Sequence, residues 1–153
     1  MQEIIEQFKN SFKNESLDKG AMSANDIIEK LKEFESTNKL VVIEMNNKIY
    51  TSDFDADSWR GSYDLPSISY SEDDSGVSID TAIENLNEVN GMEVIGYKGG
   101  QYKLYADDPI FVANYGESNN CTAIVDIVEI KDYIVCLTKE DMYWYLEPGR
   151  QYV

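Results

Sequence analysis

Histidine is absent from all 153 residues of the sequence, and only 13 lysines and arginines stand against 29 aspartates and glutamates. Without imidazole, Ser-His-Asp and Cys-His catalytic groups, histidine-ligated zinc and a histidine pH switch are excluded. The net charge of −16 repels the phosphates of DNA, RNA and anionic lipid. The composition therefore favours a protein that is not an enzyme and that binds neither nucleic acid nor a membrane directly.

Cysteine and long apolar runs are also scarce. Cys121 and Cys136 lack the spacing of metal ligands and lie in apolar, strand-like runs, where a free cysteine is usually a small buried hydrophobe. A disulfide between neighbouring strands is the alternative. No run reaches the roughly 18 apolar residues of a membrane span, and the N-terminus does not resemble a signal peptide. We expect no metal, no cofactor and a cytoplasmic location.

The residues that are present predict one globular domain over 1–153, because 42% of them are hydrophobic and 12% are aromatic. The expected fold class is α+β, with a helical segment at 1–38 and a β-rich body at 39–153. Apolar spacing predicts helices at 2–14 and 24–36, and the acidic second helix favours a helical hairpin over a DNA-binding helix-turn-helix.

The β-rich body is expected to open with a β-hairpin, strands 40–45 and 48–54 around an Asn-Asn turn. A further helix follows, capped by Ser78 and ending near Asn90-Gly91. The remaining apolar runs are separated by turn residues and predict a C-terminal antiparallel β-meander. These runs are 92–97, 101–105, 110–115, 121–128, 133–137 and 142–146.

The negative charge is concentrated in the middle of the chain. Residues 51–90 hold ten acids and one base, Arg60, which sums to −9. Such a segment either keeps the protein soluble or presents an acidic surface to a basic partner. The candidate partner-binding residues are Asp53, Asp55, Asp57, Asp64, Glu72, Asp73, Asp74, Asp80 and Glu84.

Two chemical interpretations of these acids are weak. Asp53, Asp55 and Asp57 alternate like the first ligands of an EF-hand, but Ser58 and Asp64 stand where that loop needs glycine and glutamate. The 72–74 acids resemble a pair for glycoside hydrolysis, yet no apolar sequence surrounds them to raise a pKa. Loose occupancy by a divalent ion or solvated turn aspartates are the favoured interpretations of the first group, and solvated carboxylates are the favoured interpretation of the second.

The hexapeptide 59–64, WRGSYD, has two interpretations. In the first, Trp59 covers the edge of the core while Arg60 pairs with an aspartate. In the second, aromatic rings and a guanidinium form a pocket for a planar or anionic ligand. The candidate ligand-binding residues are Trp59, Arg60, Tyr63, Tyr97, Asn114 and Tyr115.

Three motifs occur in order: WRGSYD at 59–64, GYKGGQY at 96–102 and PIFVANYGES at 109–118. Together they resemble a family of small, uncharacterised tailed-phage proteins, over about residues 57–128. The resemblance implies a phage-encoded accessory protein that acts inside an infected bacterium. It implies no activity and no catalytic residues.

Two functions are therefore expected. The first is an acidic interaction protein that binds and inhibits a host protein with a basic surface, in defence or nucleic-acid handling, by imitating the charge of nucleic acid. The alternative is a small-ligand module that sequesters a nucleotide-like signal. Homo-oligomerisation is left open by the sequence.

Overall fold

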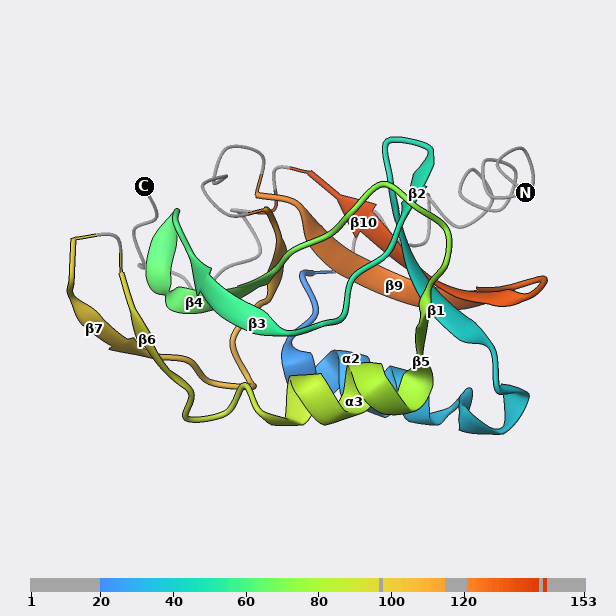
Figure 1. The fold of residues 1–153 in the computed structure, drawn as a ribbon, viewed down its shortest axis with the longest axis horizontal. Coiled ribbons are helices and arrows are strands. Elements are labelled where there is room, and N and C mark those ends of the chain that lie inside the picture. Colours follow the sequence, from blue (N-terminus) through green and yellow to red (C-terminus); the bar gives the residue numbers. More distant parts are fainter. Residues whose placement is uncertain (1–19, 97, 115–120, 141, 143–153) are drawn as a thin grey trace.

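The computed structural model describes residues 20–96, 98–114, 121–140 and 142, and they form a curled mixed β-sheet above two helices (Figure 1). The helices are α2 (Ala24–Lys32) and α3 (Ile79–Asn87), with a short 3-10 turn at Glu35–Thr37. The strands are β1 (Leu40–Met45), β2 (Lys48–Tyr50), β3 (Ala56–Trp59), β4 (Ser62–Ile68), β5 (Val77–Ser78), β6 (Glu93–Ile95), β7 (Gln101–Lys103), β8 (Phe111–Val112), β9 (Ala123–Ile130) and β10 (Tyr133–Lys139).

The main sheet has the strand order β2-β1-β10-β9-β8-β4-β3, and β5 pairs with the first half of β1. Two of its pairings are parallel, β1 with β10 and β4 with β8. Thr51 and Ser71 exchange two backbone hydrogen bonds of 3.0 and 2.9 Å. This bridge joins the chain after β2 to the chain after β4, so the sheet curls back on itself.

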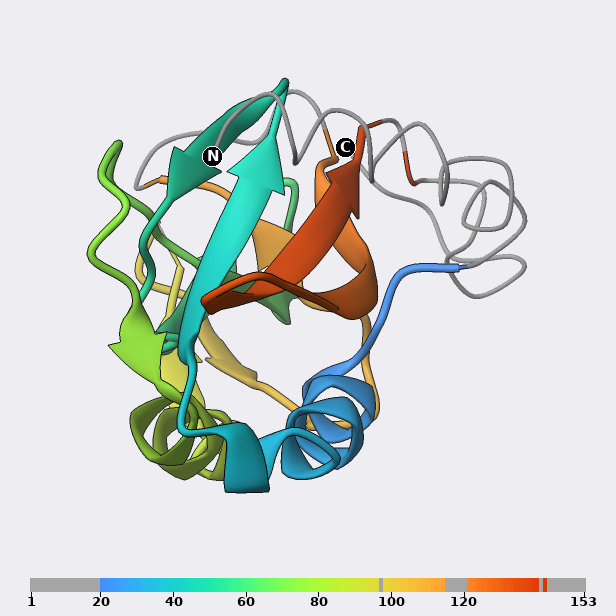
Figure 2. The ribbon, with the colours of Figure 1, turned by 90° about the vertical axis from the view of Figure 1, so that its right-hand side faces the viewer.

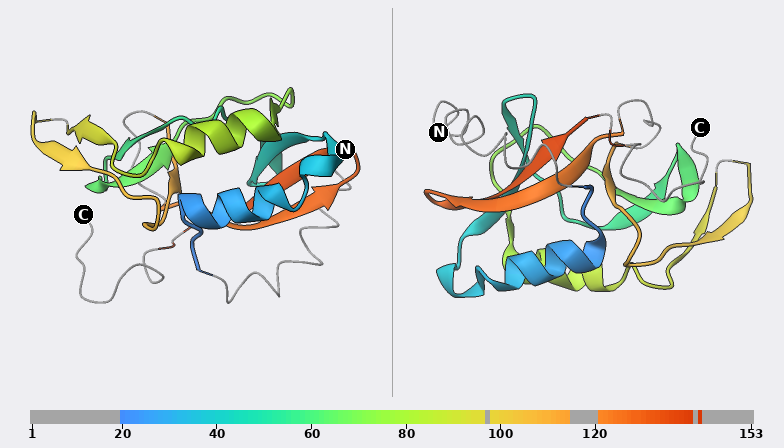
Figure 3. Two further views of the ribbon diagram at one scale, coloured as in Figure 1. Left: turned by 90° about the horizontal axis from the view of Figure 1, so that it is seen from below. Right: turned by 180° about the vertical axis from the view of Figure 1, so that it is seen from behind.

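The largest hydrophobic core lies between the sheet and the helices, which run side by side (Figures 2 and 3). One face of β1 points into this core with Val41 and Ile43, and the other face buries Val42 in a second cluster. Burial on both faces explains the nearly continuous apolar run of this strand. Glu44 interrupts the run, and its Oε2 accepts the N–H of Asn47 at 2.9 Å.

Several local predictions are confirmed. The Ser23 and Asp26 side chains form a reciprocal capping box at the start of α2, and the Ser78 hydroxyl caps α3. Asn46 and Asn47 have φ values of 50° and 65°, as a tight turn between β1 and β2 requires. Both cysteines are free and buried, as expected, and burial raises the pKa of the Cys136 thiol.

The predicted fold class and arrangement are wrong. The structure is mostly β, and the helical neighbour of α2 among the described residues is α3 rather than a preceding helix. The expected meander forms only in part: β8, β9 and β10 pair antiparallel in chain order, but β6 and β7 make a separate two-stranded sheet, β8 also pairs in parallel with β4, and β10 pairs in parallel with the distant β1. Apolar runs mark strands, but they carry no information on which distant strand becomes the partner. The expected helix 2–14 lies outside the described residues, as does the run 142–146 except for Met142.

Within the part of the chain that the structure describes, no helix has both the length and the apolar character needed to cross a membrane.

Candidate functional site

Alternating burial turns the aspartates of the segment after β2 toward solvent. Ser52, Phe54 and Ala56 are buried, whereas Asp53, Asp55 and Asp57 between them are exposed. The Asp53 Oδ1 atom accepts the backbone N–H of Asp55 at 2.9 Å, and Phe54 adopts a positive φ of 62°. The apolar anchors therefore fix the outward direction of the acidic side chains.

Helix α3 presents a second row of acids beside this segment. Asp80, Glu84 and Glu88 are exposed at successive i, i+4 positions, and a helix rise of about 1.5 Å per residue separates them by about 6 Å each. The Asn85 Nδ2 atom donates a 2.7 Å hydrogen bond to the backbone carbonyl of Asp53. This contact places the two rows next to each other.

The turn after β4 adds three more carboxylates, Glu72, Asp73 and Asp74. The Asp73 carboxylate accepts hydrogen bonds from Ser71 Oγ and from both the backbone N–H and the hydroxyl of Ser75. The Ser75 hydroxyl first, and then Thr51 and the remaining hydrogen bonds, hold the pKa of Asp73 well below its usual range. Thr51 Oγ1 also donates to the Asp73 carbonyl, which ties the turn to the segment after β2.

We call seven of these exposed acids, all of them predicted partner-binding residues, the acidic face: Asp53, Asp55, Glu72, Asp73, Asp74, Asp80 and Glu84. Their three segments lie along one side of the molecule, at the left in Figure 2. Within the described residues only Glu72 of this face forms an ion pair, at 3.4 Å from Lys48, and both side chains are more than half exposed. One lysine offsets one of the seven carboxylates, so the face stays negative.

The two remaining acids of the predicted set are not counted in the acidic face. Asp57 continues the first row onto β3, at the edge of the sheet. Asp64 is half-buried on β4, where its Oδ1 accepts the Ser62 hydroxyl at 2.6 Å. The sequence groups Asp64 with the other acids of residues 51–90, whereas in the structure it is not part of the acidic face.

Trp59 is a core residue. Its side chain is 1% exposed and stacks on Phe111, with ring centroids 4.1 Å apart and planes at 20°. Gly61 lies so close that an added Cβ atom would be 2.3 Å from Trp59 Cη2. The neighbouring Arg60 is exposed. In the Trp-Arg-Gly motif the glycine leaves room for the buried indole ring. This agrees with the interpretation in which Trp59 packs against the core.

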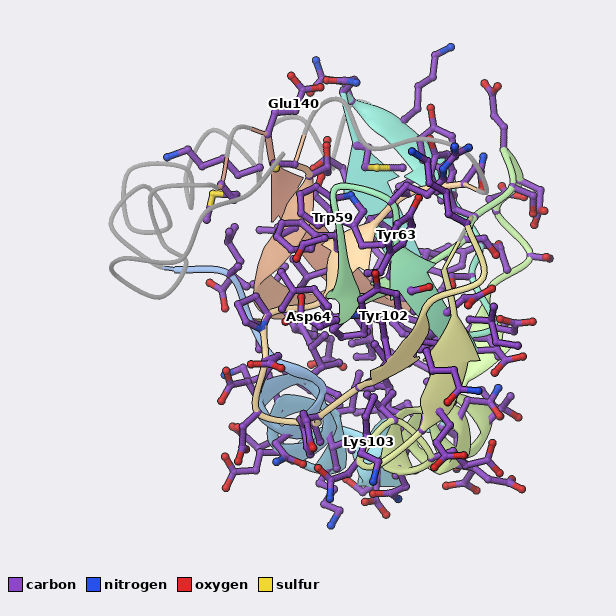
Figure 4. All side chains as sticks on the ribbon, turned by 90° about the vertical axis from the view of Figure 1, so that its left-hand side faces the viewer. Trp59, Tyr63, Asp64, Tyr102, Lys103 and Glu140 are labelled. Carbon is purple, nitrogen blue, oxygen red and sulfur yellow. The ribbon has the colours of Figure 1, made fainter. Side chains whose placement is uncertain are left out.

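Tyr63 contacts a residue that the sequence did not single out. Its ring lies 5.4 Å from that of Tyr102 on β7, at 47°, and Gly96 lies against both rings (Figure 4). The side chain of Asn114 holds the backbone of Tyr70, because its Oδ1 accepts the N–H of Tyr70 at 2.9 Å. Tyr97 and Tyr115 lie outside the described residues. The alternation of 101–103, with Tyr102 opposite Val94, is the signal that places Tyr102 on the inner face of this hairpin.

Among the described residues, no group of three or more aspartate, glutamate or cysteine side chains is arranged to hold a metal ion. Comparison with protein-family models, curated proteins and solved structures finds no match to this chain. The resemblance to tailed-phage proteins thus stays a prediction.

Proposed function

We propose that the chain is a phage-encoded interaction protein that binds a basic surface of a host protein in the host cytoplasm and thereby inhibits it. The supporting observation is the convergence of three acidic segments on one face, joined by the Asn85–Asp53 hydrogen bond and by the Thr51 contacts. It acts by binding rather than by catalysis.

The negative charge of this face indicates that the partner surface is basic. Duplex DNA carries about one negative charge per 1.7 Å of its axis, and a nucleic-acid-handling protein meets it with lysines and arginines. Ordered carboxylates compete for the same lysines and arginines, and the counterions around them are released when these cations bind. The acidic face has the sign of charge that such a basic cleft binds, and nucleic-acid mimicry is the proposed mode of inhibition.

The small-ligand function has weaker support. It needs aromatic faces open to a planar ligand, whereas Trp59 is buried against Phe111 and Tyr63 is packed on Tyr102. A ligand at Trp59 would first have to displace part of the core.

The test is capture of a host protein from infected-cell lysate on immobilised full-length chain, followed by elution with a short duplex DNA. The variant Asp80→Asn/Glu84→Gln removes two charges from the acidic face, and Glu29→Gln/Glu35→Gln removes two exposed charges elsewhere as the matched control. The proposal expects the same protein on wild type and control, much less on the face variant, and release by duplex DNA. Equal retention by the face variant, or retention that DNA does not affect, contradicts it.

A further inference from the structure

The exposed large hydrophobic side chains of the described residues occur in two places. Ile95 and Tyr105, at 71% and 50% exposure, belong to the β6–β7 hairpin and the chain that leaves it, together with the less exposed Tyr102. Leu40, at 41%, stands alone at the start of β1. Figure 1 shows the hairpin projecting at one end of the molecule, away from β1 and β5.

The hairpin has one packed face and one free face. Its register pairs Glu93 with Lys103 and Ile95 with Gln101, so these four side chains share the outer face, while the inner face packs through Tyr102 on Tyr63. Lys98 stands in the turn at the tip. Residues 92–105 hold two lysines and one glutamate, a local charge of +1 in a chain of net charge −16.

Leu40 lies at one end of the acidic face. It pairs with Ser78 of β5, and a Cβ atom added to Gly76 would be 2.9 Å from Leu40 Cβ. The hydroxyl of Tyr133, which is in register with Leu40, donates to the backbone carbonyl of Asp74. The exposed Leu40 is therefore bordered by the acidic turn and by the first turn of α3, which carries Asp80.

We propose that these two surfaces bind each other between copies of this chain. The hairpin of one copy, with Ile95 between two lysines, docks on the Leu40 patch of a second copy, where a leucine is bordered by Asp74 and Asp80. Apolar contact lies at the centre and opposite charges surround it, which is the arrangement of a specific protein interface.

The geometry and the salt dependence of this contact follow from its asymmetry. Because two different surfaces meet, the contact is head-to-tail, and each pair of copies keeps one free hairpin and one free patch, so further copies can add to form open chains. At 0.15 M salt the screening length of about 8 Å leaves only the charges near the contact effective, whereas at about 0.01 M it reaches 30 Å and the net repulsion of the two copies prevails. A basic partner on the acidic face would compete with the second copy.

The test is sedimentation velocity of the full chain over a concentration series at 0.15 M salt. The variant Glu93→Lys/Lys98→Glu/Lys103→Glu reverses the hairpin charge while keeping an opposite-charge cross-strand pair, and Asp74→Lys/Asp80→Asn alters the patch. Lys131→Glu, in the β9–β10 turn, changes the net charge by the same amount as the hairpin variant and is the control. Ile95→Asn removes the apolar centre without changing charge.

We expect the wild type and Lys131→Glu to gain mass with concentration, and each of the other variants to have a dissociation constant raised by about tenfold or more. Mixing the hairpin variant with the patch variant is expected to restore association. A wild type that stays monomeric throughout, hairpin and patch variants that associate as the wild type does, or a mixture that stays monomeric overturns the proposal. The proposed host-protein binding does not depend on this result. The capture experiment measures retention of a host protein and its release by duplex DNA, and neither requires the chain to associate with itself.

Discussion

The side-chain amide of Asn85, in the last turn of α3, donates a 2.7 Å hydrogen bond to the backbone carbonyl of Asp53, which lies 32 residues earlier in the chain. This bond connects the helix row of carboxylates to the row that follows β2. Because it involves a neutral side chain and a backbone atom, it determines the position of the charges without changing their number.

We expect Asn85→Ala to weaken partner binding although it removes no charge, because the two acidic rows lose their fixed relation. The unfolding free energy should fall by about 0.5–1.5 kcal/mol, the usual contribution of one hydrogen bond. Partner affinity and urea unfolding are the measurements. Asn87→Ala, an exposed asparagine of the same helix, is the matched control and should leave both unchanged. Unchanged affinity in Asn85→Ala would show that the arrangement of the rows has no role.

Gly61→Ala tests the packing of Trp59. The added Cβ atom would be 2.3 Å from the indole ring, which cannot move away because it is stacked on Phe111. Overpacking of this kind costs about 1–3 kcal/mol, measured as a lower midpoint of urea unfolding. Gly100→Ala is the comparison, since its Cβ atom would meet only the Tyr102 ring, at 3.1 Å. An equal or smaller loss in Gly61→Ala would contradict the burial of Trp59.

The Asp73 turn predicts a pH-dependent contribution to stability. The hydrogen bonds from Ser75, Thr51 and Ser71 lower the pKa of Asp73 in the folded state below the value of about 3.9 for an unfolded aspartate. A lowered carboxyl pKa stabilises the fold above the unfolded pKa, and the contribution is lost as the pH falls toward the folded value. The melting temperature of the wild type should thus exceed that of Asp73→Asn at pH 6, and the difference should shrink steadily below about pH 4.

Ser75→Ala provides the control for that measurement. It removes the hydroxyl that has the largest effect on the pKa of Asp73 but keeps the carboxylate. It should show a smaller version of the same pH-dependent loss. A difference between wild type and Asp73→Asn that is constant from pH 2 to pH 7 would mean that the turn does not depend on the charge of Asp73.

Local chemistry in the sequence was sufficient to predict several elements. Ser23 and Asp26 predict the start of α2, Ser78 predicts the start of α3, and Asn46-Asn47 predict the turn between β1 and β2. In each case the interacting atoms are at most a few residues apart, so the residue types determine the geometry.

Long-range pairing was not predictable in this way. Leu40 lies beside Tyr133 in a parallel pair, and both strands are apolar runs that many registers would satisfy. The acidic segment was visible as a charge run, but the separation of Asp64 from the face depends on the burial of its neighbours on β4. Whether an aromatic residue such as Trp59 is in the core or in a pocket is decided by the strand that packs on it, here β8 with Phe111.

The most direct test of the acidic face is the salt dependence of the affinity for the captured host protein, for wild type, Asp80→Asn/Glu84→Gln and Glu29→Gln/Glu35→Gln. Mimicry of nucleic acid predicts that the logarithm of the association constant falls linearly with the logarithm of salt concentration. The slope should become shallower in the face variant and remain unchanged in the control. A wild-type affinity that is flat with salt, or equal slopes in all three proteins, would contradict the proposal that this face binds the partner.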